Sequence, residues 1–379
     1  MPRPLLTRKT FSCAITVAVG LCILIHLSPI LRQYDPVDAV STLIIQLEKK
    51  KHQGAFLPRA YSGEEGVVFL KTHKTGSSTV SSIIWHNLCE AAVGARSNCF
   101  LPPRSHPGKT WDLRKKKDLD AMRSEGGSSQ HNGTWPYAVW VTHAVYSNAL
   151  FQAVPSARRM ISIVRRPSHR FQSAWHWYNH SSTLGMKLKQ FARELRSQHF
   201  VPQLKYRSGL DATTDELTGM IDMRSKVWVQ QAAFEDLVDR VISRRLFLLV
   251  AERFDESLLV LGALMKWSLD RLVYVKHKVS AYPQAPAEVM AVLESAQPFD
   301  SALWTLANYI LDRHILDLFP DTHHLEKQIT FLRNASAQLT MSCRQPPTPD
   351  NKCVCLRSRN LNLVNAETWK RKSTEDFVC

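Results

Sequence analysis

Four short apolar runs recur along the chain, and each of them is bounded by polar residues. They lie at 67–70, 137–142, 160–164 and 246–250. Segments with helical periodicity follow several of these runs, at 77–88, 169–177 and 256–267. Because strands alternate with helices, the pattern predicts an α/β fold with a parallel sheet covered by helices on both faces. The stretch at 101–135 is rich in Pro, Gly, Ser and Lys, which predicts a long surface loop.

The N-terminal part of the chain predicts a membrane anchor. The segment at 11–27 holds no charged residue, and extended to Ile30 it approaches the length that crosses a bilayer. Cations precede it and few follow, which places the N-terminus in the cytosol. A cleaved signal peptide is the alternative, but the run is long for one and no Ala-x-Ala site follows it. We therefore expect a cytosolic tail at 1–10, a transmembrane signal-anchor at 11–30, a stem at 31–63 and a lumenal domain at 64–379.

Other features fit a lumenal body. Three sequons, which predict N-glycosylation, begin at Asn132, Asn179 and Asn334. Six cysteines outside the anchor permit disulfides, although the sequence does not select a pairing. The stem is predicted to be a solvated spacer, in which apolar residues at 40, 44 and 47 would line one face of a short helix. The short anchor favours the thinner membranes of the early secretory pathway.

The net charge predicts an anionic partner. The formal net charge of the chain is +16 at pH 7. A basic balance of this size fits nucleic acid, a membrane surface or a polyanionic small ligand, and charge alone does not choose among them. A nucleic-acid partner is disfavoured because the anchor places the folded body in the lumen.

The strongest local signal follows the first apolar run. Residues 67–80 read VVFLKTHKTGSSTV, an apolar strand that leads through a Gly-containing turn into a helix. Backbone N–H groups at a helix start are unpaired and attract anions, so this turn is suited to hold a phosphate. The predicted ligand-binding residues are Lys71, Thr72, Lys74, Thr75, Gly76, Ser77, Ser78 and Thr79. The turn is not a Walker A loop, because the Lys precedes the Gly. A capped helix without a ligand is the alternative.

A second strand–loop–helix unit follows the third apolar run. Residues 160–175 read MISIVRRPSHRFQSAW and contain the pattern Arg-x-Pro-x-x-Arg-x-x-Ser. Arg165 ends the strand, where its guanidinium can donate two hydrogen bonds to a phosphate. Pro167 suits the first turn of a helix. Arg170 and Ser173 are three residues apart on that helix, so they share a face. In an open parallel sheet both units open onto the same edge, where they could grip two anionic ends of one ligand. A basic surface helix is the alternative.

Together, FLKTHKTGSST and IVRRPSHRFQS resemble the Golgi sulfotransferases that use 3′-phosphoadenosine-5′-phosphosulfate (PAPS). The sequence is most similar to the galactose 3-O-sulfotransferase family, which includes galactosylceramide sulfotransferase, and the similarity spans most of residues 65–340. The resemblance implies a P-loop-like α/β fold, a type II anchor in the Golgi membrane, PAPS as co-substrate and no catalytic metal. It places the Lys71–Thr79 turn on the 5′-phosphosulfate, and Arg165 and Ser173 on the 3′-phosphate. The implied activity is sulfate transfer to a sugar hydroxyl, with the 3-position of galactose favoured.

Three residues are predicted to carry the chemistry. Lys74 is expected to stabilise the leaving phosphate. The acceptor hydroxyl needs a base, and histidine is suited because it changes charge near neutral pH. His143 ends the second apolar run at the edge of the sheet, and the related sulfotransferases carry a His after that strand, which favours His143. His73, inside the first turn, is the other candidate, and the two could act together.

Two other functions stay open at this point. Asp118-Leu-Asp120 formally matches a manganese site of a Golgi glycosyltransferase. A catalytically inactive glycan-binding protein of the same fold is the second alternative. Cys353-Val-Cys355 and the histidines at 323 and 324 match no standard zinc spacing. The sequence does not specify the acceptor beyond a galactose-containing glycolipid or glycan. It also leaves open whether the protein forms a homodimer.

Overall fold

The computed structural model of the protein describes residues 34–49, 65–90, 99–100, 110–125, 139–197, 204, 209–220, 227–275 and 282–342. The predicted tail and anchor, the Asn132 sequon and the cysteines at 353 and 355 lie outside the described residues. Among the helices that the structure describes, none combines the length and the apolar composition needed to cross a bilayer.

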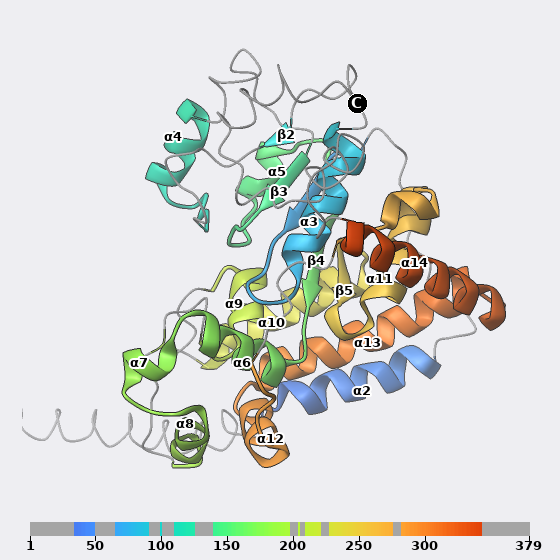
Figure 1. The fold of residues 1–379 in the computed structure, drawn as a ribbon. Coiled ribbons are helices and arrows are strands. Elements are labelled where there is room, and N and C mark those ends of the chain that lie inside the picture. The colour runs from blue at the N-terminus through green and yellow to red at the C-terminus, as the bar shows by residue number, and fades with distance from the viewer. Residues whose placement is uncertain are drawn as a thin grey trace, which may run out of the picture.

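The centre of the molecule is a parallel sheet of five strands (Figure 1). The strands are β1 (Val67–Leu70), β2 (Cys99–Phe100), β3 (Val139–Thr142), β4 (Met160–Val164) and β5 (Leu246–Val250), and their order in the sheet is β2-β3-β1-β4-β5. All four pairings are parallel. The four predicted strands are therefore confirmed, with residues 137 and 138 of the second run outside the described residues. The two-residue strand β2 was not predicted.

The strands form where they do because they are buried on both faces. Every residue of β1, β3, β4 and β5 is buried. Parallel sheets covered by helices on both faces require continuous apolar runs rather than alternation, and β-branched residues fit the pleated surface. The register pairs Val67 with Val139 and Met160 with Leu246. The carboxyl ends of these strands consequently lie along one edge of the sheet.

Helices fill the rest of the described chain. They are α2 (Pro36–Lys49), α3 (Ser77–Trp85), α4 (Lys116–Glu125), α5 (Ala149–Ala153), α6 (Pro167–Trp177), α7 (His180–Leu184), α8 (Leu188–Leu195), α9 (Ala212–Thr218), α10 (Val227–Ile242), α11 (Phe254–Met265), α12 (Ala287–Ser295), α13 (Pro298–Leu318) and α14 (Thr322–Ser342). Figure 1 shows helices packed around the strands; α10, α11 and α13 each contact β5, and α3 contacts β3. Every residue of β1, β3, β4 and β5 is buried, which requires cover on both faces of the sheet. The predicted two-sided covering of the sheet is therefore confirmed.

Two predicted segments differ from the structure. The helix expected at 77–88 is α-helical only to Trp85 and continues as one π-helical turn, His86–Glu90. The predicted surface loop at 101–135 contains α4, so the loop prediction is wrong for Lys116–Glu125. The Lys-rich sequence of α4 does not indicate a helix. The turn before the helix is closed by the Asp118 carboxylate, which accepts the backbone N–H of Asp112 at 3.0 Å.

The first described helix corrects the prediction of a solvated spacer. Helix α2 lies along α13, on the outer side of the helical layer (Figure 1). Val40 is only 2% exposed and belongs to the main hydrophobic core, and Ile44 packs against the same core. The apolar stripe of α2 is thus a packing surface. Residues 36–49 form part of the folded body.

The order of the strands marks where a ligand is expected. Strand β1 lies between β3 and β4. From β1 the chain passes through α3 to β2 and β3 on one side, and then crosses to β4 and β5 on the other side. The direction of the connections reverses at β1, and in open α/β sheets ligands bind at such a switch point, outside the carboxyl ends of the strands.

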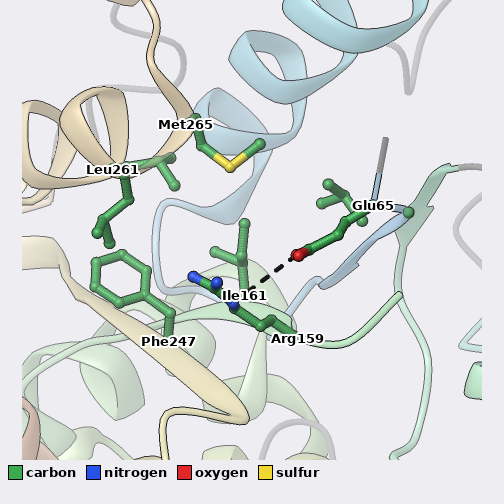
Figure 2. A pocket seen from close by; sticks show the side chains of 9 residues that line it. Glu65, Arg159, Ile161, Phe247, Leu261 and Met265 are labelled. Carbon is green, nitrogen blue, oxygen red and sulfur yellow. Dashed lines mark ion pairs between the residues drawn. The ribbon is translucent and has the colours of Figure 1, made fainter. Parts of the chain in front are cut away.

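A pocket at the opposite edge of the sheet is a different feature. It is lined by the amino-terminal ends of β1, β4 and β5 and by α11. Figure 2 shows Glu65 facing Arg159 in an ion pair of 4.0 Å, with Phe247, Leu261 and Met265 around them. Because these residues precede or begin their strands, the pocket lies away from the residues predicted to bind the ligand.

Candidate functional site

The turn between β1 and α3 has a backbone suited to anions. Lys74 and Gly76 both adopt the left-handed conformation, with φ of 63° and 87°. Left-handed residues in a tight turn direct backbone N–H groups toward one side, which creates a concavity for an anion. Gly76 is the residue just before α3, and a Cβ placed there would meet no atom within 4 Å. The backbone conformation therefore favours glycine at this position, and the space above it is open.

Three of the predicted ligand-binding hydroxyls hold the turn itself. The Thr72 hydroxyl donates to the carbonyl of Ile163 on β4 at 2.6 Å. The Thr75 hydroxyl lies 2.9 Å from the Thr72 hydroxyl, and the Ser77 hydroxyl donates to the Thr72 carbonyl at 2.6 Å. All three side chains are buried. The turn is consequently fixed against β4 before any ligand arrives. Ser78 and Thr79, in the first turn of α3, are partly exposed and are therefore better placed to contact a ligand.

The Lys74 ammonium lies beside an aromatic ring at the surface. Its Nζ atom is 4.1 Å from the centre of the Trp177 indole, a cation–π contact. Trp177 is the last residue of α6 and is 56% exposed. The predicted neighbour Lys71, by contrast, is buried directly after β1. Of the two lysines, Lys74 is the one that reaches the open side of the turn.

The two predicted anion-binding units meet. The Arg165 guanidinium, at the end of β4, donates to the backbone carbonyl of Lys74 at 3.2 Å. The side chain that should hold the 3′-phosphate therefore lies next to the turn that should hold the 5′-phosphosulfate. Both belong to the carboxyl edge at the switch point beside β1.

A carboxylate that sequence reasoning missed lies among the basic residues. Glu252 accepts the backbone N–H of Arg166 at 3.1 Å through each of its oxygens, so it neutralises the start of α6. It also lies 3.9 Å from Arg165 and 3.7 Å from His169, and it accepts the indole N–H of Trp304 at 3.1 Å. Its position directly after β5, at the ligand-binding edge, was a signal that the sequence offered.

Arg170, another of the predicted ligand-binding residues, lies in the interior of the protein. Arg170 and Ser173 do share a face of α6, but it is the buried face, and Arg170 is 0% exposed. Its guanidinium donates to the carbonyl of Gly209 at 2.6 Å and to Gln297 at 2.7 Å, and it lies 3.4 Å from Asp300. A buried charge needs such partners, and they direct Arg170 into the interior.

The two candidate bases are brought together. The His73 and His143 rings are stacked, with their centres 3.9 Å apart and their planes 17° from parallel. His143 follows β3, and its Nδ1 atom donates to the backbone carbonyl of Lys71 at 2.6 Å. A ring whose Nδ1 donates to a carbonyl keeps its Nε2 lone pair for accepting a proton. The histidine pair lies directly beside the β1–α3 turn, since His73 is part of it.

Glu216 was also missed, and no sequence signal marks it. It lies on α9, in the stretch after residue 206 where no site was predicted. Its carboxylate pairs with the His73 imidazole and accepts the His73 backbone N–H at 3.0 Å. These two residues are 143 positions apart in the chain, so only the fold reveals the contact.

Three further carboxyl groups lie behind Glu216, around the start of α9. Asp300 accepts the backbone N–H of Thr214 at 2.7 Å, and Asp211 accepts that of Asp300 at 2.7 Å. Burial, together with the charges of Asp211, Asp300 and Glu216, raises the pKa of Asp215 to about 9, against the opposing charge of Arg170. Burial and the charge of Asp300 also hold the pKa of Asp211 well above its ordinary value.

This cluster predicts a pH-dependent stability. Folded Asp215 keeps its proton up to about pH 9, whereas unfolded Asp215 releases it near the ordinary value of 3.8. Because the folded state binds more protons between these values, Asp215 lowers the free energy of unfolding as pH rises, by about 1.4 kcal/mol per unit at most. We expect Asp215→Asn to raise the melting temperature at pH 8 and to change it little at pH 4. Differential scanning calorimetry at both values checks this, with exposed Asp120→Asn as the control. An equal shift at both pH values would contradict it.

The two carboxylates of the formal manganese motif lie in different surroundings. Asp118 is buried and its carboxylate accepts the Asp112 N–H, whereas Asp120 is exposed. The His324 ring contacts Gln328 at 2.6 Å on the surface of α14. Within the ranges that the structure describes, no group of three or more His, Cys, Asp or Glu residues could hold a metal ion.

Two of the three predicted glycosylation sites lie in the described chain. Asn179 is exposed, and it is the residue just before α7, with a left-handed backbone conformation. Asn334 is exposed on α14, but the hydroxyl of Ser336 in its sequon is buried and accepts the backbone N–H of Tyr274 at 3.2 Å. The Ser181 hydroxyl of the Asn179 sequon likewise accepts the indole N–H of Trp175 at 2.8 Å. Glycosylation of these asparagines stays a prediction.

Comparisons with known proteins point to one family. A family model described as galactose-3-O-sulfotransferase matches residues 6–362. Galactose-3-O-sulfotransferase 3 of Homo sapiens is 26% identical over 296 residues, which cover 73% of this chain and 63% of the relative. Galactosylceramide sulfotransferase of Homo sapiens is 24% identical over 301 residues, with the same coverage. Galactose-3-O-sulfotransferase 2 of Mus musculus is 23% identical over 305 residues, which cover 75% and 71%.

The chain thus spans about 63% of the length of the first human relative. No solved structure matches it. The family match extends over nearly the whole sequence and includes both strand–loop–helix units at the carboxyl edge of the sheet. On that evidence, this chain belongs to the galactose-3-O-sulfotransferase family.

Proposed function

We propose that the protein transfers the sulfuryl group of PAPS to a hydroxyl of galactose, with the 3-position favoured. One observation carries the proposal. The β1–α3 turn with Lys74, the Arg165 guanidinium and the stacked pair His73 and His143 meet at the carboxyl edge of the sheet. A donor with two anionic ends and a hydroxyl acceptor need cations and a base in one place.

The residues at this edge fit the donor. The left-handed backbone at Lys74 and Gly76, with open space above Gly76, suits a phosphate at the start of α3. Lys74 and Arg165 provide two full charges beside that turn. Of the two residues predicted for the 3′-phosphate, Arg165 and Ser173, Arg165 supports this role more directly, because Ser173 is buried. When bound, PAPS supplies a sulfuryl group attached to a phosphate leaving group.

The protein's own groups then have distinct tasks. The Lys74 ammonium and the free N–H groups of the first turn of α3 offset the charge that builds up on the leaving phosphate. A histidine of the stacked pair accepts the acceptor's hydroxyl proton while the new oxygen–sulfur bond forms and the sulfur–oxygen bond to the phosphate breaks. Trp177, exposed beside Lys74, offers an apolar surface next to the reacting group.

The acceptor and the cellular setting are parts of the same proposal. Relatives are named for galactose and for galactosylceramide, which supports a galactose-containing glycolipid or glycan as the acceptor. A type II anchor at 11–30 would hold the catalytic domain in the Golgi lumen, where the acceptors of such enzymes are assembled. Protease protection of the body in intact microsomes, together with co-localisation with a Golgi marker, tests this setting.

The direct test is an activity assay on the full chain. Purified protein is incubated with ³⁵S-labelled PAPS and a panel of galactosides that includes galactosylceramide, and the sulfated position is mapped by NMR. We expect label on galactose, unchanged by EDTA. Label transfer that requires a divalent metal, or glycan binding without any transfer, would replace the proposal with one of the two alternatives.

A further inference from the structure

The side chain of Glu216 makes two contacts with one residue. Glu216 is 1% exposed, and one of its oxygens pairs with the His73 Nδ1 atom. Its other oxygen accepts the His73 backbone N–H at 3.0 Å. One buried carboxylate therefore fixes both the ring of His73 and the backbone of the β1–α3 turn at that residue.

These contacts determine where the hydrogen on the ring lies. An ionised carboxylate can only accept hydrogen bonds, so the Nδ1 atom of His73 must carry a hydrogen. The Nε2 atom of a neutral ring then keeps its lone pair. A carboxylate behind a histidine orients it and selects its tautomer in the same way at hydrolytic and metal sites.

The fold holds Glu216 firmly in this position. The backbone carbonyl of Glu216 accepts the N–H of Tyr146, which follows β3 and His143, at 2.9 Å. The amino-terminal turn of α9 is held by Asp300, which accepts the Thr214 N–H at 2.7 Å and lies 3.4 Å from Arg170. The buried Arg170 thus contributes through the support of α9.

The two stacked rings differ because of Glu216. His143 uses its Nδ1 on the neutral carbonyl of Lys71, whereas His73 uses its Nδ1 on a carboxylate. Both rings therefore direct Nδ1 to a protein acceptor, and the Nε2 atom of His73 lies on the other side of its ring, 3.5 Å from the Thr110 hydroxyl, which can donate to it. A positive charge that arises on His73 when it takes a proton is balanced by the adjacent carboxylate.

We propose that Glu216 is a positioning residue of the transfer reaction, which holds His73 with Nδ1 protonated and Nε2 ready to accept a proton. The inference rests on the proposed function for its role in turnover. The assignment of the tautomer itself rests only on the contacts of Glu216.

The kinetic test compares Glu216→Gln with Glu216→Asp and Glu216→Ala. In Glu216→Gln the amide oxygen can still accept the His73 backbone N–H, but the amide nitrogen then faces Nδ1 and forces the hydrogen onto Nε2. We expect kcat to fall about 100-fold or more while KM for PAPS stays within about threefold. Glu216→Asp should recover part of kcat relative to Glu216→Ala, because the carboxylate is restored.

The matched control is Asp118→Asn. Asp118 is another buried carboxylate that accepts a backbone N–H, but its described contacts include neither histidine of the pair. This variant should keep kcat within about twofold. If Glu216→Gln also kept the wild-type kcat, a positioning role would be excluded. A rise in KM and a fall in melting temperature in proportion to the fall in kcat would exclude it as well.

A spectroscopic readout separates this inference from the proposed function. In ¹⁵N-histidine-labelled protein at alkaline pH, long-range ¹H–¹⁵N spectra report which ring nitrogen carries the hydrogen, and His73→Gln assigns the signal. We expect Nδ1–H in the wild type and Nε2–H in Glu216→Gln. The Nε2–H form in the wild type would overturn the inference, even if sulfotransferase activity is present. Nδ1–H in a protein without that activity would leave the assignment standing while the proposed function fails.

Discussion

Lys74→Ala is expected to lower kcat for sulfate transfer by about 1,000-fold while the protein still folds. The ammonium lies at the open side of the β1–α3 turn, beside Arg165 and the histidine pair, where charge on the leaving phosphate has to be offset. Removing one preorganised charge of this kind typically costs about 100- to 1,000-fold in kcat. Steady-state kinetics with ³⁵S-labelled PAPS and a galactoside measure the loss, and calorimetry checks the fold.

Lys266→Ala is the matched control for this variant. Lys266 is an exposed lysine that also adopts a left-handed backbone, with φ of 56° against 63° for Lys74. Both substitutions therefore remove one positive charge and place alanine in an unfavourable backbone region. Lys266→Ala should retain activity. Normal turnover by Lys74→Ala would show that the ammonium has no part in the chemistry.

His143→Ala and His73→Ala are each expected to lower kcat by about 100- to 10,000-fold, the usual contribution of a positioned general base. The rings stack at 3.9 Å, so removal of either also frees the other to move. The double variant should consequently lose little more than the worse single variant, because residues that act as a unit are not additive. Turnover is measured for all three variants from pH 5 to pH 9.

The outcome of this series identifies the base. If His73→Ala is inactive at every pH and His143→Ala keeps a measurable rate, His73 takes the proton and His143 supports its ring. The reverse result assigns the proton to His143, the histidine favoured by its place after β3. Near-normal turnover in both single variants would place the base outside the pair.

Much of the fold could be predicted because the strands are buried on both faces. β1, β4 and β5 coincide with continuous apolar runs, and this pattern depends only on local composition. Strand β2, with two residues, carries no such pattern. Residues 36–49 were predicted to belong to a solvated spacer, and only the contact of α2 with α13 shows that the apolar face has a partner.

The site was predictable where it follows a strand and not where it depends on long-range contacts. Lys74, His143 and Arg165 each follow the carboxyl end of a strand, so topology alone brings them together. The burial of Arg170 could not be predicted, because a spacing of three residues defines a helix face without showing whether solvent or Asp300 lies opposite it. Glu216 has no local signal, since its partner lies on a distant turn.

The central claim is that one nucleotide is held between the Lys74 turn and Arg165. Isothermal titration calorimetry with 3′-phosphoadenosine-5′-phosphate and with adenosine 5′-monophosphate, on the wild type and Arg165→Ala, tests it most directly. The wild type should bind the bisphosphate far more tightly than the monophosphate, and Arg165→Ala should bind the two about equally, since the 3′-phosphate has lost its guanidinium. An undiminished preference for the bisphosphate in Arg165→Ala, or no nucleotide binding by the wild type, would contradict the account.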